Sequence, residues 1–250
     1  IGLAKDAYGL DEVIAHEIAH SWYYSALGSN ERRYPFMDEG ITSANEVRYM
    51  RERYPQKKLW ETNVRNLKLA KFFHIDQMPV KLMRELEWLS QARDNLEQPI
   101  NLPADDYNTL NYSLVIYNKA GTGFNYLRAY LGDSIYDASM KEYFQKWKFR
   151  HPQPDDLQRV FESTTSKDLS WFFTDFIATT KRMDYKVVGF ANQKVLIRNK
   201  GELISPLVIS GMKGDSIHFK KWIDGFRGKQ WIELPPGNHS ELKIDPRHVT

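Results

Sequence analysis

The chain has 250 residues, of which 42% are apolar and 27% are charged, close to the ordinary values for globular proteins. Its net charge is only +3, from 35 basic and 32 acidic residues, and the basic residues are scattered without a recognised binding motif, which excludes a nucleic-acid-binding footprint. The lack of cysteine excludes disulfides and thiolate metal ligands, and no apolar run approaches the roughly 18 residues of a membrane span.

The first predicted helix carries an H-E-x-x-H stretch from His16 to His20. Asp11 can cap its start, and Gly28 follows its end. Residues four apart differ by only about 40° around a helix, so the two histidines project from one face and can occupy two corners of a tetrahedral zinc site. Glu17 would sit where a general base can take a proton from water in the open position. Beside the histidines, Ile14, Ile18 and Trp22 form an apolar stripe at helical spacing.

The second predicted helix opens at Glu39 and runs roughly to Tyr54, where Pro55 halts it. A third metal ligand cannot come from the first helix, so Glu39 is the candidate. Glu46 follows seven residues later on almost the same face, placed to accept the second ring N–H of a metal-bound histidine. The alternative is a polar helix face with no metal, in which Glu39 only complements the positive helix end.

Further helices are predicted over Leu82–Leu96 and Ile135–Phe149, and Gly132 closes the helix before the latter. After Asp184 the pattern changes to short runs of β-type residues separated by turns, which favours a small antiparallel sandwich. The predicted strands cover residues 185–190, 194–199, 207–209, 217–223 and 230–234. The sequence therefore predicts a helical domain over residues 1–183 and an all-β domain over residues 184–250.

One further segment has two tyrosines five residues apart, Tyr112 and Tyr117, followed by Lys119 and a glycine-containing helical stretch. Together with H-E-x-x-H, 18 intervening residues and Glu39 followed by glycine, this segment resembles the gluzincin zinc aminopeptidases, the family of aminopeptidase N and leukotriene hydrolase. Residues 117–120 match the Y-x-K-G element of that family, and Glu46 matches its glutamate seven beyond the third ligand. Residues 149–157 and 168–173 look like its later helices. The resemblance covers roughly residues 8–183.

The resemblance implies a mostly α catalytic domain, thermolysin-like in its helical part, followed by a β-sandwich. It implies a zinc metallopeptidase, most simply an aminopeptidase acting near the N-terminus of peptide substrates with a zinc-bound water. It assigns roles to seven residues: the ligands of one Zn²⁺ per chain are His16, His20 and Glu39, the outer-shell partner is Glu46, the general base is Glu17, and the oxyanion donor is Tyr117, with Tyr112 as a second candidate.

The sequence departs from the family in three respects. Asp38 stands where many relatives carry Asn, and Ala120 replaces the usual Gly. The family's G-x-M-x-N strand, which binds the substrate backbone, does not precede the histidine helix. We therefore expect this chain to be the C-terminal portion of a longer protein whose N-terminal domain packs on it, and we expect the chain alone to bind zinc but to hydrolyse peptides weakly.

Two other functions remain compatible with the sequence. One is a non-catalytic homologue that serves as a peptide-binding or scaffolding module, and the other is a hydrolase of a non-peptide substrate with the same zinc site. The sequence does not fix the compartment, although a periplasmic or extracellular location is slightly favoured over a cytoplasmic one.

Overall fold

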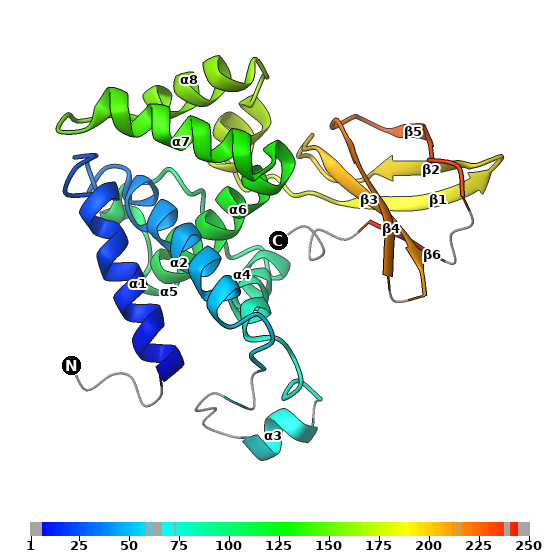
Figure 1. Cartoon of the computed structure of the whole chain (residues 1–250), viewed down its shortest axis with the longest axis horizontal. Helices are drawn as coiled ribbons and strands as arrows, with labels where there is room; N and C mark the ends of the chain where they lie inside the picture. Colours follow the sequence, from blue (N-terminus) through cyan, green and yellow to red (C-terminus); the bar gives the residue numbers. More distant parts are fainter. Residues whose placement is uncertain are drawn as a thin grey trace.

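The structure is a computed structural model that describes residues 7–58, 61, 67–72, 74–214, 216–237 and 241–244. Helices form its first part and strands its last part (Figure 1). The α-helices are α1 Ala7–Tyr23, α2 Glu39–Arg53, α3 Leu67–Phe72, α4 Met83–Arg93, α5 Thr109–Asn111, α6 Ala120–Leu131, α7 Asp133–Trp147 and α8 Pro154–Thr165. The shorter segments are the 3₁₀ turns η1 Pro35–Met37, η3 Val80–Leu82 and η4 Ala104–Asp106, and the π-helices η5 Tyr112–Lys119 and η6 Trp171–Phe176.

The core of the helical part is built around α2, which packs against α1, η5 and α6 (Figure 1). Small residues let these elements approach closely. A Cβ added at Gly40 would lie 2.8 Å from Cβ of Ala120, and one at Gly121 would lie 3.1 Å from Cβ of Ser43. The start of α2 is therefore held against the end of η5. This crossing matters because Glu39 and Tyr117 lie on these two segments.

Phe124 is the central aromatic residue of this core, with an exposed fraction of 0% and its ring 5.2 Å from that of Phe172. We expect Phe124→Ala to lower the free energy of unfolding by about 3–5 kcal/mol, because it removes buried apolar surface and leaves a cavity. Phe149→Ala is the matched control, since the Phe149 side chain is 83% exposed. Chemical denaturation of the two variants measures the difference, and equal losses would contradict the placement of Phe124.

The last part contains the strands β1 Tyr185–Ala191, β2 Lys194–Asn199, β3 Leu207–Lys213, β4 Ser216–Ile223, β5 Lys229–Glu233 and β6 Glu241–Lys243. They form two three-stranded antiparallel sheets, in the orders β1-β2-β5 and β4-β3-β6. Both sheets contribute to one apolar core, with Val195 and Ile197 from the first and Leu207 and Ile209 from the second. The predicted fold class, a helical part followed by a small all-β part, is confirmed.

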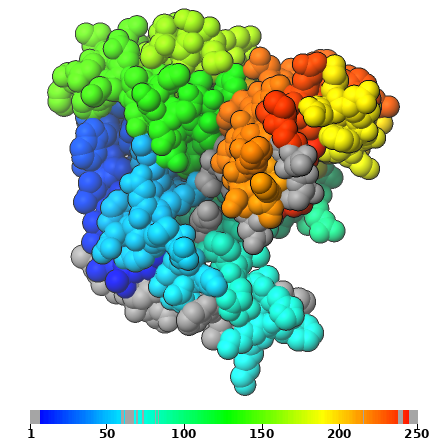
Figure 2. Space-filling view, turned by 45° about the vertical axis from the view of Figure 1, so that its right-hand side comes forward, coloured from blue at the N-terminus to red at the C-terminus, as the bar shows by residue number. Residues whose placement is uncertain are grey.

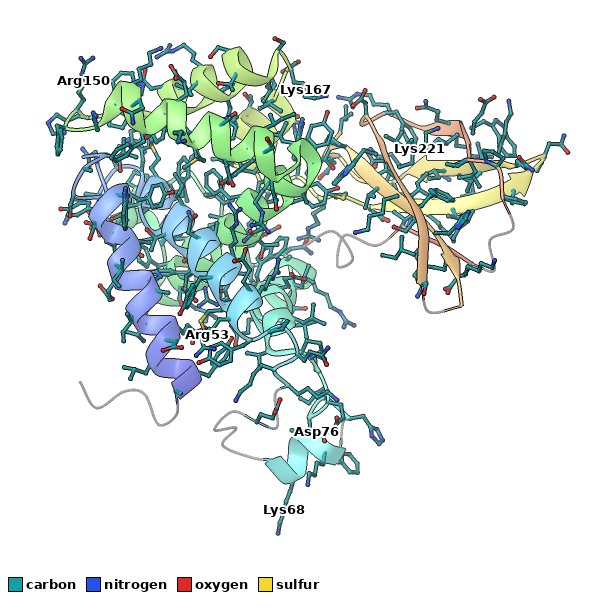
Figure 3. All side chains as sticks on the ribbon, viewed as in Figure 1. Arg53, Lys68, Asp76, Arg150, Lys167 and Lys221 are labelled. Atoms are coloured by element: carbon teal, nitrogen blue, oxygen red, sulfur yellow. The ribbon has the colours of Figure 1, made fainter. Side chains whose placement is uncertain are left out.

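Aromatic side chains join the two parts. The Trp222 ring on β4 lies edge-on to Tyr126 and Tyr130 of α6, at centroid distances of 5.5 and 5.3 Å. The Tyr126 hydroxyl donates to the Pro206 carbonyl at 2.6 Å. Figure 2 shows the orange strands against the green helices at this junction. Figure 3 labels Lys167 on the side of the helical part nearest the strands, where its Nζ donates to the Tyr130 hydroxyl at 3.4 Å.

Several predicted elements can be compared with the structure. The helix from Glu39 ends at Arg53, one residue before the predicted end, and Gly132 closes α6 with a φ of +81°. The prediction that Asp11 caps the first helix is wrong, because α1 already includes Ala7 and the Asp11 carboxylate instead accepts a hydrogen bond from the Tyr54 hydroxyl at 2.7 Å. Strand β6 was not predicted. The proposed domain boundary at residue 183 stays a prediction, although the change from helix to strand falls between Phe176 and Tyr185.

The apolar stripe predicted on the first helix is present but is not buried. Ile14, Ile18 and Trp22 are 44%, 54% and 49% exposed. Among the described residues of α1, Ala19 alone is buried. Of the helices within the described residues, none is both long enough and apolar enough to cross a membrane.

Candidate metal centre and active site

The two histidines of α1 lie one helical turn apart, with their rings edge to face at a centroid distance of 4.8 Å. Their Nε2 atoms both face the same oxygen of Glu39, the first residue of α2. The distance from Glu39 Oε2 is 3.0 Å to His16 and 3.5 Å to His20. The structure therefore brings together the three residues that the sequence predicted as ligands, from two helices that cross at the core.

The donor set fits a zinc ion. The candidate ligand atoms of His16, His20 and Glu39 all lie within 4.8 Å of one another. Donors about 2.1 Å from a tetrahedral metal lie about 3.4 Å from each other, and the two distances to Glu39 bracket that value. Two imidazoles and one carboxylate with a fourth position left free form the ligand set of a hydrolytic zinc site. These residues could hold a metal.

Each histidine also has a carboxylate on its other ring nitrogen. Nδ1 of His16 lies 3.0 Å from Glu46 Oε2, and Nδ1 of His20 lies 2.7 Å from Asp38 Oδ1. A carboxylate at Nδ1 favours the tautomer that has its proton there and leaves Nε2 free to bind a metal. Glu46 was predicted in this place, whereas Asp38 was not. The sequence feature that could have indicated this role for Asp38 is that an acidic residue directly precedes Glu39, the predicted third ligand.

The Glu46 carboxylate is itself anchored by Arg84 of α4. Nη2 of Arg84 donates to Glu46 Oε1 at 2.5 Å and to Glu12 Oε1 at 3.1 Å. Glu12 lies one turn before His16 on α1, so the arginine ties together α1, α2 and α4 behind the histidine. Arg84 was not predicted from the sequence, because nothing local shows that a residue 38 positions after Glu46 folds back onto it. A cavity of about 440 Å³ opens beside this network.

The carboxylates change the protonation of the metal-free site. Burial lowers the pKa of His16, but hydrogen bonds to Glu39 and Glu46 outweigh this effect and raise the pKa to about 9. Burial alone would raise the pKa of Glu39, yet hydrogen bonds from His16 and Tyr117 and the nearby histidine charges bring it below its usual range. Burial raises the pKa of Asp38 to about 6, against the opposing effect of His20. A metal entering this site at neutral pH would therefore displace a proton from His16.

Tyr117 faces the same site from the π-helix η5. Its ring stacks against that of His16 at a centroid distance of 5.8 Å and an interplanar angle of 22°. Burial and the hydrogen bond that its hydroxyl donates to Glu39 raise the pKa of Tyr117 well above its usual value, so the hydroxyl keeps its proton. Tyr112 lies one ring further away, 6.1 Å from Tyr117, and packs on its other side against Tyr107. The structure thus places Tyr117 directly beside the candidate ligands and Tyr112 next to Tyr117. Burial and the nearby charge of Glu39 raise the pKa of Tyr112 above its usual value.

Glu17 follows His16 on α1 and is exposed. Within the described part of the chain, its carboxylate makes no hydrogen bond or ion pair, so it is free to meet water. Its neighbours on the helix surface include the exposed side chains of Val13 and Ile14, four and three residues before it. The apolar stripe beside the histidines was predicted, and in the structure it is exposed together with Glu17.

Comparisons with known proteins identify the fold and the family of this chain. The fold resembles the crystal structure of Legionella pneumophila aminopeptidase A in complex with aspartic acid, with a TM-score of 0.58 and 14% identity over 89% of this chain and 24% of that one. Curated relatives include alanine/arginine aminopeptidase of Saccharomyces cerevisiae, 21% identical over 73% of this chain and 19% of that protein. Another is human endoplasmic reticulum aminopeptidase 2, 24% identical over 62% of this chain and 14% of that protein.

This chain thus spans about a fifth or less of the length of these curated relatives. The sequence profile of the peptidase family M1 domain matches residues 4–176, well over half of the chain. The resemblance to the gluzincin aminopeptidases that the motifs predicted is therefore confirmed. The chain belongs to peptidase family M1.

Proposed function

We propose that this chain carries the zinc-binding and bond-cleaving residues of an aminopeptidase. His16, His20 and Glu39 would hold one zinc ion, and Glu46 and Asp38 would orient the two imidazoles. The observation that carries the proposal is the convergence of both Nε2 atoms on one Glu39 oxygen while both Nδ1 atoms are held by other carboxylates. A mere polar surface would not orient both rings in this way.

Two side chains would act on a peptide at this site. When bound, zinc supplies Lewis-acid polarisation of the scissile carbonyl and makes a water molecule more acidic. Glu17, which is exposed beside His16, would take a proton from the attacking water and pass it to the leaving amine. The protonated Tyr117 hydroxyl would donate a hydrogen bond to the carbonyl oxygen as negative charge develops there. Tyr112, one ring further from the site, would play at most a secondary part.

The exposed face of α1 supports a role for this chain as part of a larger protein. Leu10, Val13, Ile14, Ile18 and Trp22 are each at least 39% exposed, and a cavity of about 430 Å³ runs between this face and α2. Exposed apolar patches of this kind mark surfaces that bind other protein segments. Because the relatives are several times longer than this chain, we propose that another part of the same protein covers the face.

Metal analysis tests the ligand assignment. After dialysis against zinc, the purified chain should contain one zinc ion, and His20→Ala should lose it because two ligands do not make a structural or catalytic zinc site. His151→Ala is the matched control. This histidine is exposed, and its Nδ1 forms a hydrogen bond of 2.8 Å with the Gly28 carbonyl oxygen instead of facing the candidate ligands. The control should keep its zinc ion, and retention of zinc in His20→Ala would overturn the assignment.

Glu46→Gln should weaken zinc binding by about 10- to 100-fold. An amide oxygen is a weaker hydrogen-bond acceptor for the Nδ1–H of His16 than a carboxylate, so it raises the basicity of the His16 ring less. The variant also weakens the contact with Arg84, so its melting temperature should be measured beside its zinc affinity. Glu52→Gln serves as the control, since Glu52 lies on the same helix with its side chain 76% exposed. Competition with a chromogenic zinc chelator gives the affinities, and an unchanged value for Glu46→Gln would remove Glu46 from the site.

A further inference from the structure

Lys119 is a charged residue in the core that the proposed chemistry does not use. It ends η5, two residues after Tyr117, and its side chain is only 2% exposed. Residues two apart on a helix do not face the same way. Tyr117 therefore points to the metal centre, while Lys119 points from the same turn into the interior.

The partner of Lys119 is Glu97, whose side chain is also 2% exposed. Nζ lies 3.1 Å from Glu97 Oε2, close enough for an ion pair although not aligned as a hydrogen bond. The same oxygen accepts a hydrogen bond from Trp88 Nε1 at 2.9 Å, and the other oxygen lies 3.6 Å from Arg182 Nε. The rings of Trp88 and Phe176 flank the ammonium at 5.9 and 5.5 Å. A single carboxylate thus links the end of η5 to α4 and to the segment that leads into β1.

A second contact holds the same turn. Asn118 is 8% exposed, and its Nδ2 donates to Glu87 Oε2 of α4 at 3.0 Å. Two consecutive side chains, Asn118 and Lys119, therefore anchor the end of η5 on the side away from the metal centre. Burial lowers the pKa of Lys119 while Glu97 opposes that shift, as expected for a cation kept in the core by its partner.

Such a pair is poorly explained by stability alone. Removing two charges from water is costly, and buried ion pairs can often be replaced by apolar residues without loss of stability. Their best supported use is to fix one arrangement among several. Here the segment has such an alternative, because a π-helix competes with the ordinary α-helical hydrogen-bond register. A change of register over residues 112–119 would turn Lys119 away from Glu97 and move the Tyr117 hydroxyl.

We propose that Lys119 is a positioning residue for Tyr117: its buried ion pair with Glu97 fixes the register of η5 and so holds the Tyr117 hydroxyl beside His16 and Glu39. The inference rests on the proposed function, in which that hydroxyl stabilises the developing oxyanion. It adds a residue that touches neither metal nor substrate. The buried pair and the unusual helix that it terminates carry the inference together.

The test uses the zinc-loaded chain and the variant Lys119→Met/Glu97→Gln, which removes both charges but keeps an amide oxygen for Trp88. Lys194→Met/Glu233→Gln makes the same changes in an ion pair of 2.8 Å in the β part. We expect kcat on an aminoacyl-anilide to fall by about 10- to 100-fold in the first variant, with KM little changed, because small displacements of a catalytic group cost that much. The control should keep its kcat.

A double-mutant cycle separates positioning from general damage. In a Tyr117→Phe background, Lys119→Met/Glu97→Gln should cause no further loss of kcat, because the group that it positions is already absent. An equal loss in both backgrounds would overturn the proposal. If the double variant does not fold, Lys119→Met alone, which leaves Glu97 with Trp88 and Arg182 as partners, should give the same pattern.

Amide hydrogen exchange distinguishes this inference from the proposed function. Peptides covering residues 112–119 should exchange faster in Lys119→Met/Glu97→Gln than in the parent, at an unchanged melting temperature. Unchanged exchange would overturn the positioning role even if the protein is an active peptidase. Faster exchange in a protein that turns over no peptide would support the positioning of η5 and count against the proposed function instead.

Discussion

Replacing Glu17 with glutamine is expected to reduce peptide turnover by about 100- to 10,000-fold while leaving the zinc content unchanged, because a positioned general base contributes that much to rate. Glutamine keeps the size and hydrogen-bonding shape of the side chain but cannot take a proton. The histidines and Glu39 are untouched, so the metal should remain. Parallel measurement of kcat and of zinc per chain therefore separates loss of the base from loss of the site.

Glu142→Gln is a suitable control for this experiment, because Glu142 is an exposed residue of α7. Activity close to normal in Glu17→Gln would mean that another group is the base. The absolute rate of the parent chain should be low, since Glu17 lies on an open face of α1 where water weakens the charge interactions of its carboxylate. The ratio between variant and parent is therefore the quantity to compare.

Replacing Tyr117 with phenylalanine is expected to lower kcat by about 100- to 1000-fold, the usual cost of removing one oxyanion donor. Only the hydroxyl is lost, and the ring can still stack on His16. KM should change little, because the hydrogen bond strengthens only as charge develops on the carbonyl oxygen. Steady-state kinetics on a series of aminoacyl-anilides gives both constants.

Tyr112→Phe and Tyr130→Phe complete this comparison. Tyr112→Phe should cause a smaller loss of kcat, because the Tyr112 ring packs on Tyr117 while the Tyr117 ring packs on His16. Tyr130→Phe should cause none, because Tyr130 lies at the junction with the β part. A larger loss for Tyr112→Phe than for Tyr117→Phe would reverse the assignment of the donor. A higher KM with an unchanged kcat would show that the tyrosine binds substrate and does not stabilise the transition state.

The parts of the site that depend on local spacing could be predicted from the sequence. His16 and His20 are one helical turn apart wherever the segment is helical, and Glu46 follows Glu39 by nearly two turns on the same face. The contact between the two helices could also be predicted, because the third ligand cannot come from the helix that carries the two histidines. In the structure, small residues such as Gly40 make their close packing possible.

Other parts required the tertiary fold or the family resemblance. Arg84 reaches Glu46 from a helix 38 residues later, and no local pattern indicates that contact. Tyr117 was assigned by resemblance, because one tyrosine among 14 carries no signal of its own. The π-helix that presents it has hydrogen bonds that periodicity does not distinguish from an α-helix. Asp11 was misassigned because a good capping residue can also lie inside a helix when its side chain finds another partner, here Tyr54.

The most direct test of the central claim is a crystal structure of the zinc-loaded chain with anomalous diffraction measured at the zinc absorption edge. We predict a single strong peak about 2.0–2.2 Å from Nε2 of His16, Nε2 of His20 and a carboxylate oxygen of Glu39. The Nδ1 contacts of the two histidines with Glu46 and Asp38 should be retained. A peak at other residues, or none at this site in zinc-saturated crystals, would contradict the claim that these three side chains form the metal centre.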